Sequence, residues 1–137
     1  MFDPGAPARV ESLTIETAAG VKHEFKVEIV KDDQARDRGL MFRQSLPADG
    51  GMLFEYDPPQ SIAFWMKNTF IPLDIIFIDA NGVILNIAAN TTPLSLVQLQ
   101  SSGAARGILE VNADTTARFG IRAGDHVRHR IFTGAPQ

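Results

Sequence analysis

The polar residues best placed for chemistry lie in an otherwise apolar stretch, residues 64–79. Within about sixteen residues this stretch carries Lys67, Asn68 and Asp74 among Phe, Trp, Ile and Leu side chains. Removing a charge from water costs several kcal/mol unless it is paired or hydrogen-bonded, so we expect these groups to have partners or to face a cleft. Two interpretations stay open: a structural ion pair of Asp74 with Lys67 or Arg43, and a ligand-facing site.

Arg43 is a second cation placed directly after an apolar cluster, residues 40–42. A guanidinium binds a carboxylate or phosphate through two parallel hydrogen bonds, and an ammonium group adds a point charge. Arg43 and Lys67 are therefore candidates for binding an anion together. The alternative for each is an ordinary ion pair.

A long hydroxyl-rich segment, residues 91–107, is a third candidate part of the site. Unstructured segments of this length in a compact domain are usually functional or mobile. We expect it to fold over Arg43 and Lys67 as a lid, which would add Ser101 and Arg106 to the ligand-binding residues.

Glu110 is a charged residue inside an apolar run, residues 107–111. In a strand, successive side chains point to opposite faces, so Glu110 lies on the face opposite Leu109 and Val111. We expect that face to be open to solvent. An enzyme interpretation instead makes Asp74 or Glu110 a general acid or base beside Lys67.

Other common chemistries lack their residues. The chain has no cysteine, which excludes disulfides, thiolate metal sites and cysteine nucleophiles. Of the three histidines, His126 and His129 are three positions apart in a predicted strand and point to opposite faces, while His23 is distant in sequence. The motifs G-x-S-x-G, G-x-G-x-x-G and G-x-x-x-x-G-K-[ST] are absent. We predict no metal and no cofactor.

Length and charge limit the class of protein. A chain of 137 residues, 45% hydrophobic, supports one core without disulfides. With 13 basic and 16 acidic residues, its net charge of -3 gives no broad basic field. Nucleic-acid binding and docking on an anionic membrane therefore lack their electrostatic basis. No apolar run reaches membrane-spanning length, so we predict no stable membrane insertion.

Periodicity predicts many strands and two short helices. Residues 12–16 and 23–30 alternate apolar and polar side chains, which indicates a half-buried hairpin. Asp32 as an N-cap and Gly39 as a stop signal bound a helix over 33–38. A second helix is expected over 113–119, capped by Asn112 and ended by Gly120. Further strands are expected at 52–54, 62–68, 74–79, 83–89, 107–111 and 125–132.

These elements predict an α+β fold that is mostly β. The helices are too short to cover a doubly wound sheet, so we expect an antiparallel or mixed sheet curled toward a barrel, with two short helices. We divide the chain into a flexible leader (1–9), a single domain (10–133) and a tail (134–137).

Several motifs resemble one known family. They are MFR at 41–43, LP at 46–47, GMLF at 51–54, FWMKNT at 64–69, IPLDIIFI at 71–78 and GIRAGD at 120–125. Over about residues 10–133 the chain resembles the DUF192 family of small bacterial and archaeal proteins. This resemblance implies a small β-rich single domain, frequently exported behind a signal or lipoprotein segment, and no established activity. The chain departs from the family pattern at 104–107, where AARG replaces an expected proline and aromatic residue.

Our expectation for function is a noncatalytic binding domain. It places a small anionic or polyhydroxylated molecule in a polar cleft formed by Arg43, Lys67, Asn68 and Asp74, beside the 101–106 loop. The alternatives are the hydrolase-type enzyme using Asp74 or Glu110 and a protein-interaction module that binds through an edge strand. We expect a periplasmic or other extracytoplasmic location, with a cytoplasmic one as the alternative. The oligomeric state is left open.

Overall fold

The computed structural model describes residues 9–132, so the predicted leader before Arg9 and the predicted tail at 134–137 lie outside the described residues. The strands and helices occur in the following order: β1 (Val10–Glu16), β2 (Lys22–Val30), α1 (Asp33–Arg38), β3 (Gly50–Gln60), β4 (Ala63–Phe64), β5 (Leu73–Ile78), β6 (Ile84–Ala88), β7 (Leu99–Gln100), β8 (Ala105–Asn112), α2 (Thr115–Phe119) and β9 (His126–Arg128). The prediction of a mostly β fold with two short helices is confirmed.

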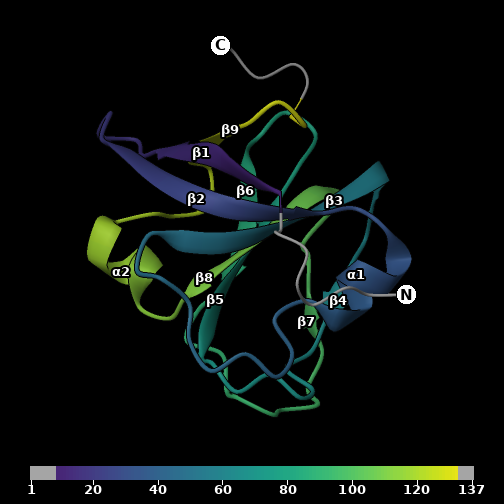
Figure 1. The fold of residues 1–137 in the computed structure, drawn as a ribbon. Coiled ribbons are helices and arrows are strands. Elements are labelled where there is room, and N and C mark those ends of the chain that lie inside the picture. Colours follow the sequence, from purple (N-terminus) through teal and green to yellow (C-terminus); the bar gives the residue numbers. More distant parts are fainter. Residues whose placement is uncertain (1–8, 133–137) are drawn as a thin grey trace.

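Seven strands form one strongly curled sheet (Figure 1). Its order is β6-β5-β8-β3-β2-β1-β9, and β2–β3 is a parallel pair within an otherwise antiparallel sheet. The two ends of the sheet approach each other, because Val83, just before β6, forms a bridge with His126 of β9. The sheet is therefore mixed and curled toward a barrel, as the sequence predicts. The short strands β4 and β7 form a separate pair.

The sheet has an apolar core on each of its faces. The inner face contributes alternate residues such as Leu53, Ile76 and Leu109, which are fully buried inside the curl. The outer face of β3, β5 and β8 contributes the intervening residues, such as Phe54 and Phe77, and packs beneath the segments that follow β2 and β3. Burial on both faces explains why residues 75–78, which follow Asp74 in β5, are all apolar.

The first helix forms where its capping signals place it. The Asp32 side chain accepts a hydrogen bond from the backbone N–H of Ala35 at 2.8 Å, and Gly39 ends the helix with φ 49°. Positive φ is a conformation that glycine adopts at little cost, which favours a helix stop at this position.

Several predicted element boundaries are wrong, and the strand expected at 125–132 is limited to His126–Arg128. The strand expected at 62–68 is limited to Ala63–Phe64, because a turn follows it and Asn68 has φ 55°. The second helix begins at Thr115, with Asp114 at the N-cap position. Asn112 does not cap it, since its side-chain amide donates to the carbonyl oxygens of Leu46 and Pro47.

Within residues 9–132, no helix has the length and apolar character needed to cross a membrane.

Candidate functional site

A cleft of about 860 Å³ opens on the outer face of the sheet. The sheet side is formed by Phe54 and Tyr56 of β3 and Glu110 of β8, while α1 and the segments 39–42 and 60–69 form the walls and mouth. Its size lies in the range of small-molecule sites. We call it the outer cleft.

Glu110 is the buried acidic group of the outer cleft. It lies in β8 directly between Met52 of β3 and Ile75 of β5, on the face opposite Leu109 as predicted. The expectation that this face is open to solvent is wrong, because Glu110 is only 5% exposed. Segments distant in sequence cover the face, which strand alternation alone does not reveal.

The Glu110 carboxyl group lacks the partners that a buried charge needs. Its Oε1 atom is buried without a hydrogen bond. Burial raises the pKa of Glu110 from 4.5 to about 8, because the ionised form loses its hydration. At neutral pH the carboxyl group is therefore protonated, and it can donate a hydrogen bond as well as accept one.

Tyr56 lines the same cleft as Glu110 and is close enough to respond to its charge. Burial raises the pKa of Tyr56 to about 12, while the Arg36 cation lowers it and the negative charges of Glu110 and Asp37 add to the rise. Its hydroxyl group therefore stays protonated at neutral pH. The cleft thus presents two neutral hydroxyl-type groups, each able to donate and accept hydrogen bonds.

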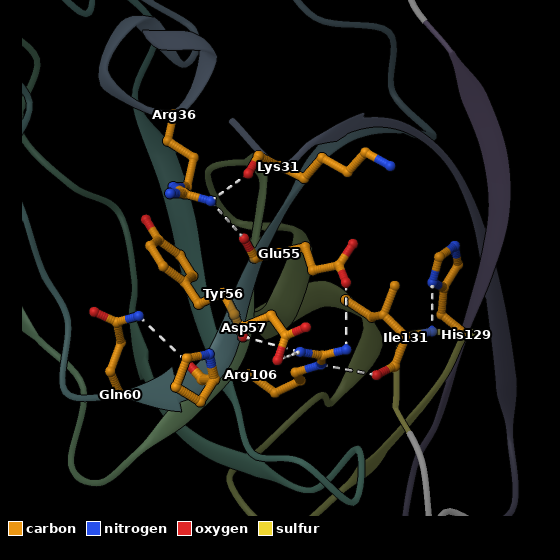
Figure 2. A network of polar contacts seen from close by, with 10 residues as sticks. Lys31, Arg36, Glu55, Tyr56, Asp57, Gln60, Arg106, His129 and Ile131 are labelled. Carbon is orange, nitrogen blue, oxygen red and sulfur yellow. Dashed lines mark hydrogen bonds and ion pairs between the residues drawn. The ribbon is translucent and has the colours of Figure 1, made fainter. Parts of the chain in front are cut away.

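Arg36 holds the Tyr56 ring in place. Its guanidinium lies 4.8 Å from the ring centroid and donates to the carbonyl oxygens of Lys31 and Glu55 (Figure 2). It also pairs with the Asp33 carboxylate. With three hydrogen bonds already made within the protein, Arg36 positions the ring and is a poor candidate for binding a ligand anion.

The mouth of the outer cleft is aromatic. Phe42 and Trp65 line it, and their side chains are 51% and 45% exposed. Deeper in, Phe64 packs edge-on against Phe54 with ring centroids 5.1 Å apart. Exposed aromatic faces next to hydrogen-bonding groups are suited to molecules with both apolar and hydroxyl-bearing surfaces.

Two of the six predicted site residues line this cleft. Lys67 is exposed at the mouth, with its ammonium nitrogen 5.2 Å from the centroid of the Trp65 ring. Asn68 also lines the cleft, and its carbonyl oxygen accepts a hydrogen bond from the Phe42 backbone N–H at 2.9 Å. That hydrogen bond connects the 39–42 segment to the 60–69 segment at the mouth of the cleft.

Arg43 lies outside the cleft lining and pairs with Glu28. Its two terminal nitrogens donate to the two Glu28 carboxylate oxygens, each at 2.6 Å. This hydrogen bonding raises the pKa of Arg43, which stays charged. Arg43 and Lys67 therefore do not form the predicted anion site in this structure. Arg43 instead forms an ion pair, as the alternative interpretation expected, but its partner is Glu28 and not Asp74.

The Arg43 pair gives a direct prediction. Because Arg43 is partly exposed, we expect Arg43→Ala to lower the free energy of unfolding by only about 1 kcal/mol. Chemical denaturation of the variant and of the matched Glu28→Ala variant should give similar losses. Loss of ligand binding in the folded Arg43→Ala variant, with binding intact in Glu28→Ala, would contradict this assignment.

Asp74 is fully buried on the inner side of β5. Its Oδ1 accepts from the Asn90 N–H at 2.9 Å, and its Oδ2 accepts from the Thr116 N–H and hydroxyl at 2.9 and 2.8 Å. It therefore connects β5, the segment after β6 and the start of α2. Both oxygens are occupied, and Asp74 does not line the outer cleft.

Ser101 and Arg106 also serve as internal connections. The Ser101 hydroxyl accepts from the Ile62 N–H and donates to the Gly103 carbonyl oxygen. Arg106 contacts the carboxylates of Glu55 and Asp57 and donates to the Tyr56 and Ile131 carbonyl oxygens (Figure 2).

The 91–107 segment does not cover Arg43. It runs beside the turn after β4, where the Ser95 carbonyl oxygen accepts from the Met66 N–H and the Leu94 N–H donates to the Thr69 carbonyl oxygen. Its strand β7 pairs with β4. The segment thus supports one side of the cleft mouth, and the lid expected over Arg43 and Lys67 is not formed.

Sequence reasoning missed Tyr56 and Arg36. Tyr56 extends the alternation of Met52 and Phe54 on β3, so extending that strand by two residues would have placed it on the outer face. Arg36 has no comparable signal, since its contact with Tyr56 depends on how α1 packs on the sheet.

Within residues 9–132, no group of three or more His, Cys, Asp or Glu side chains is arranged to hold a metal ion.

Comparisons with known proteins identify a family without an assigned activity. A crystal structure of a protein of unknown function from Novosphingobium aromaticivorans DSM 12444 is 36% identical, with TM-score 0.87, covering 94% of this chain and 91% of that chain. A protein from Sinorhizobium meliloti 1021, described as a proposed transcription regulator, is 35% identical, with TM-score 0.89, covering 92% and 98%. No curated protein sequence matches. The DUF192 model, "Uncharacterized ACR", matches residues 14–129, and the chain belongs to this family.

Proposed function

We propose that the protein binds a small polyhydroxylated molecule in the outer cleft without transforming it. The observation that carries this proposal is the buried Glu110 carboxyl group, which lines the cleft with Oε1 unpaired. An unpaired buried polar atom costs roughly 1–3 kcal/mol, so a ligand that hydrogen-bonds to the group recovers part of that cost.

The chemistry of the cleft favours hydroxyl groups over a strongly anionic group. A protonated carboxyl group and a phenol offer neutral donors and acceptors, which match the hydroxyl groups of a sugar or polyol. The C–H face of such a molecule can pack on Trp65 at the mouth. Lys67 adds a single positive charge there, so an acidic sugar is compatible with the same site.

We expect NMR titration of the ¹⁵N-labelled protein with glucose, N-acetylglucosamine, maltose and glycerol to shift the amides of Tyr56, Trp65, Asn68 and Glu110. Glu110→Met should weaken binding of the responding compound at least tenfold, because it removes the hydrogen-bonding group. It should not unfold the protein, because Glu110 is surrounded by apolar side chains such as Met52 and Ile75.

The matched control is Glu24→Met, which changes an exposed glutamate on β2 and should leave binding unchanged. If none of the four compounds shifts the cleft amides up to its solubility limit, the polyhydroxylated ligand class is wrong. Equal weakening by Glu24→Met and Glu110→Met would also contradict the site.

A hydrolase is the second candidate, and the raised pKa of Glu110 favours it. A carboxyl group with a pKa near the working pH is suited to general acid catalysis. The test uses 4-nitrophenyl glycosides and esters. Hydrolysis that Glu110→Gln abolishes, while the variant still binds the compounds, would support catalysis; absence of hydrolysis would support binding alone.

Neither the charge nor the helices of the protein favour a role in transcription. The net charge of -3 gives no electrostatic basis for DNA binding, so the transcription role named for the Sinorhizobium relative has no support from the charge of this chain. Within the described residues, α1 and α2 have only six and five residues, which is short for a recognition helix.

An extracytoplasmic location stays a prediction, and fractionation of the native host would test it.

A further inference from the structure

A second cavity lies on the side of the molecule away from α1 and the outer cleft. It has a volume of about 380 Å³ and is lined by residues of the turn joining β1 to β2, of the helix α2 and of the turn that follows α2. Figure 1 shows α2 and α1 on opposite sides of the molecule. We call this cavity the α2 pocket. We propose that it binds a small molecule carrying an oxyanion group, either a carboxylate or a phosphate.

Unpaired positive charge gathers at this pocket. Six arginines of the described chain form ion pairs with carboxylates: Arg9, Arg36, Arg43, Arg106, Arg128 and Arg130. Within residues 9–132, Arg118 and Arg122 have no carboxylate partner, and both line the α2 pocket. The Arg118 guanidinium lies 5.1 Å from the centroid of the Phe119 ring. Two guanidinium groups beside one cavity are suited to an oxyanion.

The acidic residue of the pocket is already engaged by the backbone. Asp125 is buried, and its two oxygens accept hydrogen bonds from the Ala18 N–H at 3.1 Å and the Arg122 N–H at 2.8 Å. The lining thus carries two guanidinium groups and one carboxylate, which gives it excess positive charge in a protein whose net charge is -3.

His23 contributes a flat wall and an unsatisfied polar atom. Its ring stacks on Phe119 with centroids 4.3 Å apart and planes 8° from parallel. Its Nε2 atom is buried without a hydrogen-bond partner. A buried ring nitrogen is costly without a partner, and an oxygen of a molecule in the adjacent pocket is one that can satisfy it.

Together these features describe a pocket with an aromatic wall and a cationic opening. The ligand that fits has an oxyanion for Arg118 and Arg122 and a small body that contacts Phe119 and His23. A carboxylate and a phosphate share this recognition, and the experiment distinguishes them.

The experiment titrates the ¹⁵N-labelled protein separately with inorganic phosphate and with benzoate. We expect the amides of residues 18–23 and 118–125 to shift, and Arg118→Gln or Arg122→Gln to raise the Kd at least tenfold. Both side chains are exposed, so these variants should keep the fold. Tighter binding of benzoate identifies a carboxylate ligand, and tighter binding of phosphate identifies a phosphorylated one.

Two controls separate this site from general charge effects and from the outer cleft. Arg130→Gln removes the same charge at an exposed, distant position and should leave the Kd unchanged, as should Glu110→Met. An absence of shifts with both anions would overturn the proposal. So would shifts spread over all arginine positions, or an equal rise in Kd for Arg130→Gln and Arg122→Gln.

Discussion

Replacing Glu110 by Gln should make the protein more stable at alkaline pH and leave its stability at pH 5 nearly unchanged. The substitution keeps the size and hydrogen-bonding character of the protonated side chain but cannot ionise. In the wild-type protein, burial holds the pKa of Glu110 at about 8, against 4.5 for the exposed group.

The direction of this change in stability with pH follows from proton binding. Between these two pKa values the folded state keeps a proton on Glu110 that the unfolded state has released, so stability falls as the pH rises. This loss of unfolding free energy is absent below about pH 4.5, grows up to about pH 8 and is then constant. Its upper limit is roughly 4–5 kcal/mol, at 1.36 kcal/mol for each pKa unit.

Urea denaturation at intervals from pH 5 to pH 9 tests this expectation. The difference in unfolding free energy between Glu110→Gln and the wild type should increase with pH, because other titrating groups contribute equally to both proteins. Glu24→Gln, at an exposed position on β2, should give a curve parallel to that of the wild type. A parallel curve for Glu110→Gln as well would mean that the carboxyl group is already ionised in the folded protein.

Asp74→Ala should be the most destabilising single change among the predicted site residues. It leaves three donors without an acceptor, the N–H groups of Asn90 and Thr116 and the Thr116 hydroxyl group. Unsatisfied buried donors that had bonded to a charge cost about 1–3 kcal/mol each, so we expect a loss of about 4 kcal/mol. Asp74→Asn keeps one acceptor oxygen and should lose about half as much.

The matched control is Asp79→Ala in the turn between β5 and β6, where Asp79 is half-buried. The Asp79 Oδ1 atom accepts from the N–H groups of Asn81 and Val83, which are only partly shielded from water, so its removal should cost only about 1 kcal/mol. Denaturant midpoints of the three variants give the comparison. If Asp74→Ala is no less stable than Asp79→Ala and instead loses ligand binding, Asp74 belongs to a binding site after all.

Much of the fold was predictable because its signals are local. Alternating side chains in β1 and β2 and the Asp32 cap depend only on neighbouring residues. The order of the sheet is not local: β3 pairs with β2 in parallel and with β8 across 45 to 60 residues of sequence. No short motif encodes that pairing.

The candidate site was harder to predict for the same reason. The polar residues of the 64–79 stretch were expected to converge, but a strand places Asp74 on the inner face, while Lys67 and Asn68 lie in the preceding turn. The sequence shows a charge in an apolar setting; it does not show whether hydrogen bonds already satisfy that charge. Asp74 is satisfied, and Glu110, expected to face solvent, is buried with Oε1 unpaired.

The proposed binding site depends on a Glu110 carboxyl group that stays protonated in the folded protein. Carboxyl-detected ¹³C NMR across pH 4 to pH 10 follows each glutamate separately, and Glu110→Gln assigns the signal by its disappearance. We predict a Glu110 midpoint near pH 8, well above 4.5, the ordinary value for a glutamate. We also predict that the midpoint shifts when a polyhydroxylated compound occupies the outer cleft. A midpoint near pH 4.5 that no such compound moves would contradict a neutral carboxyl group as the centre of the site.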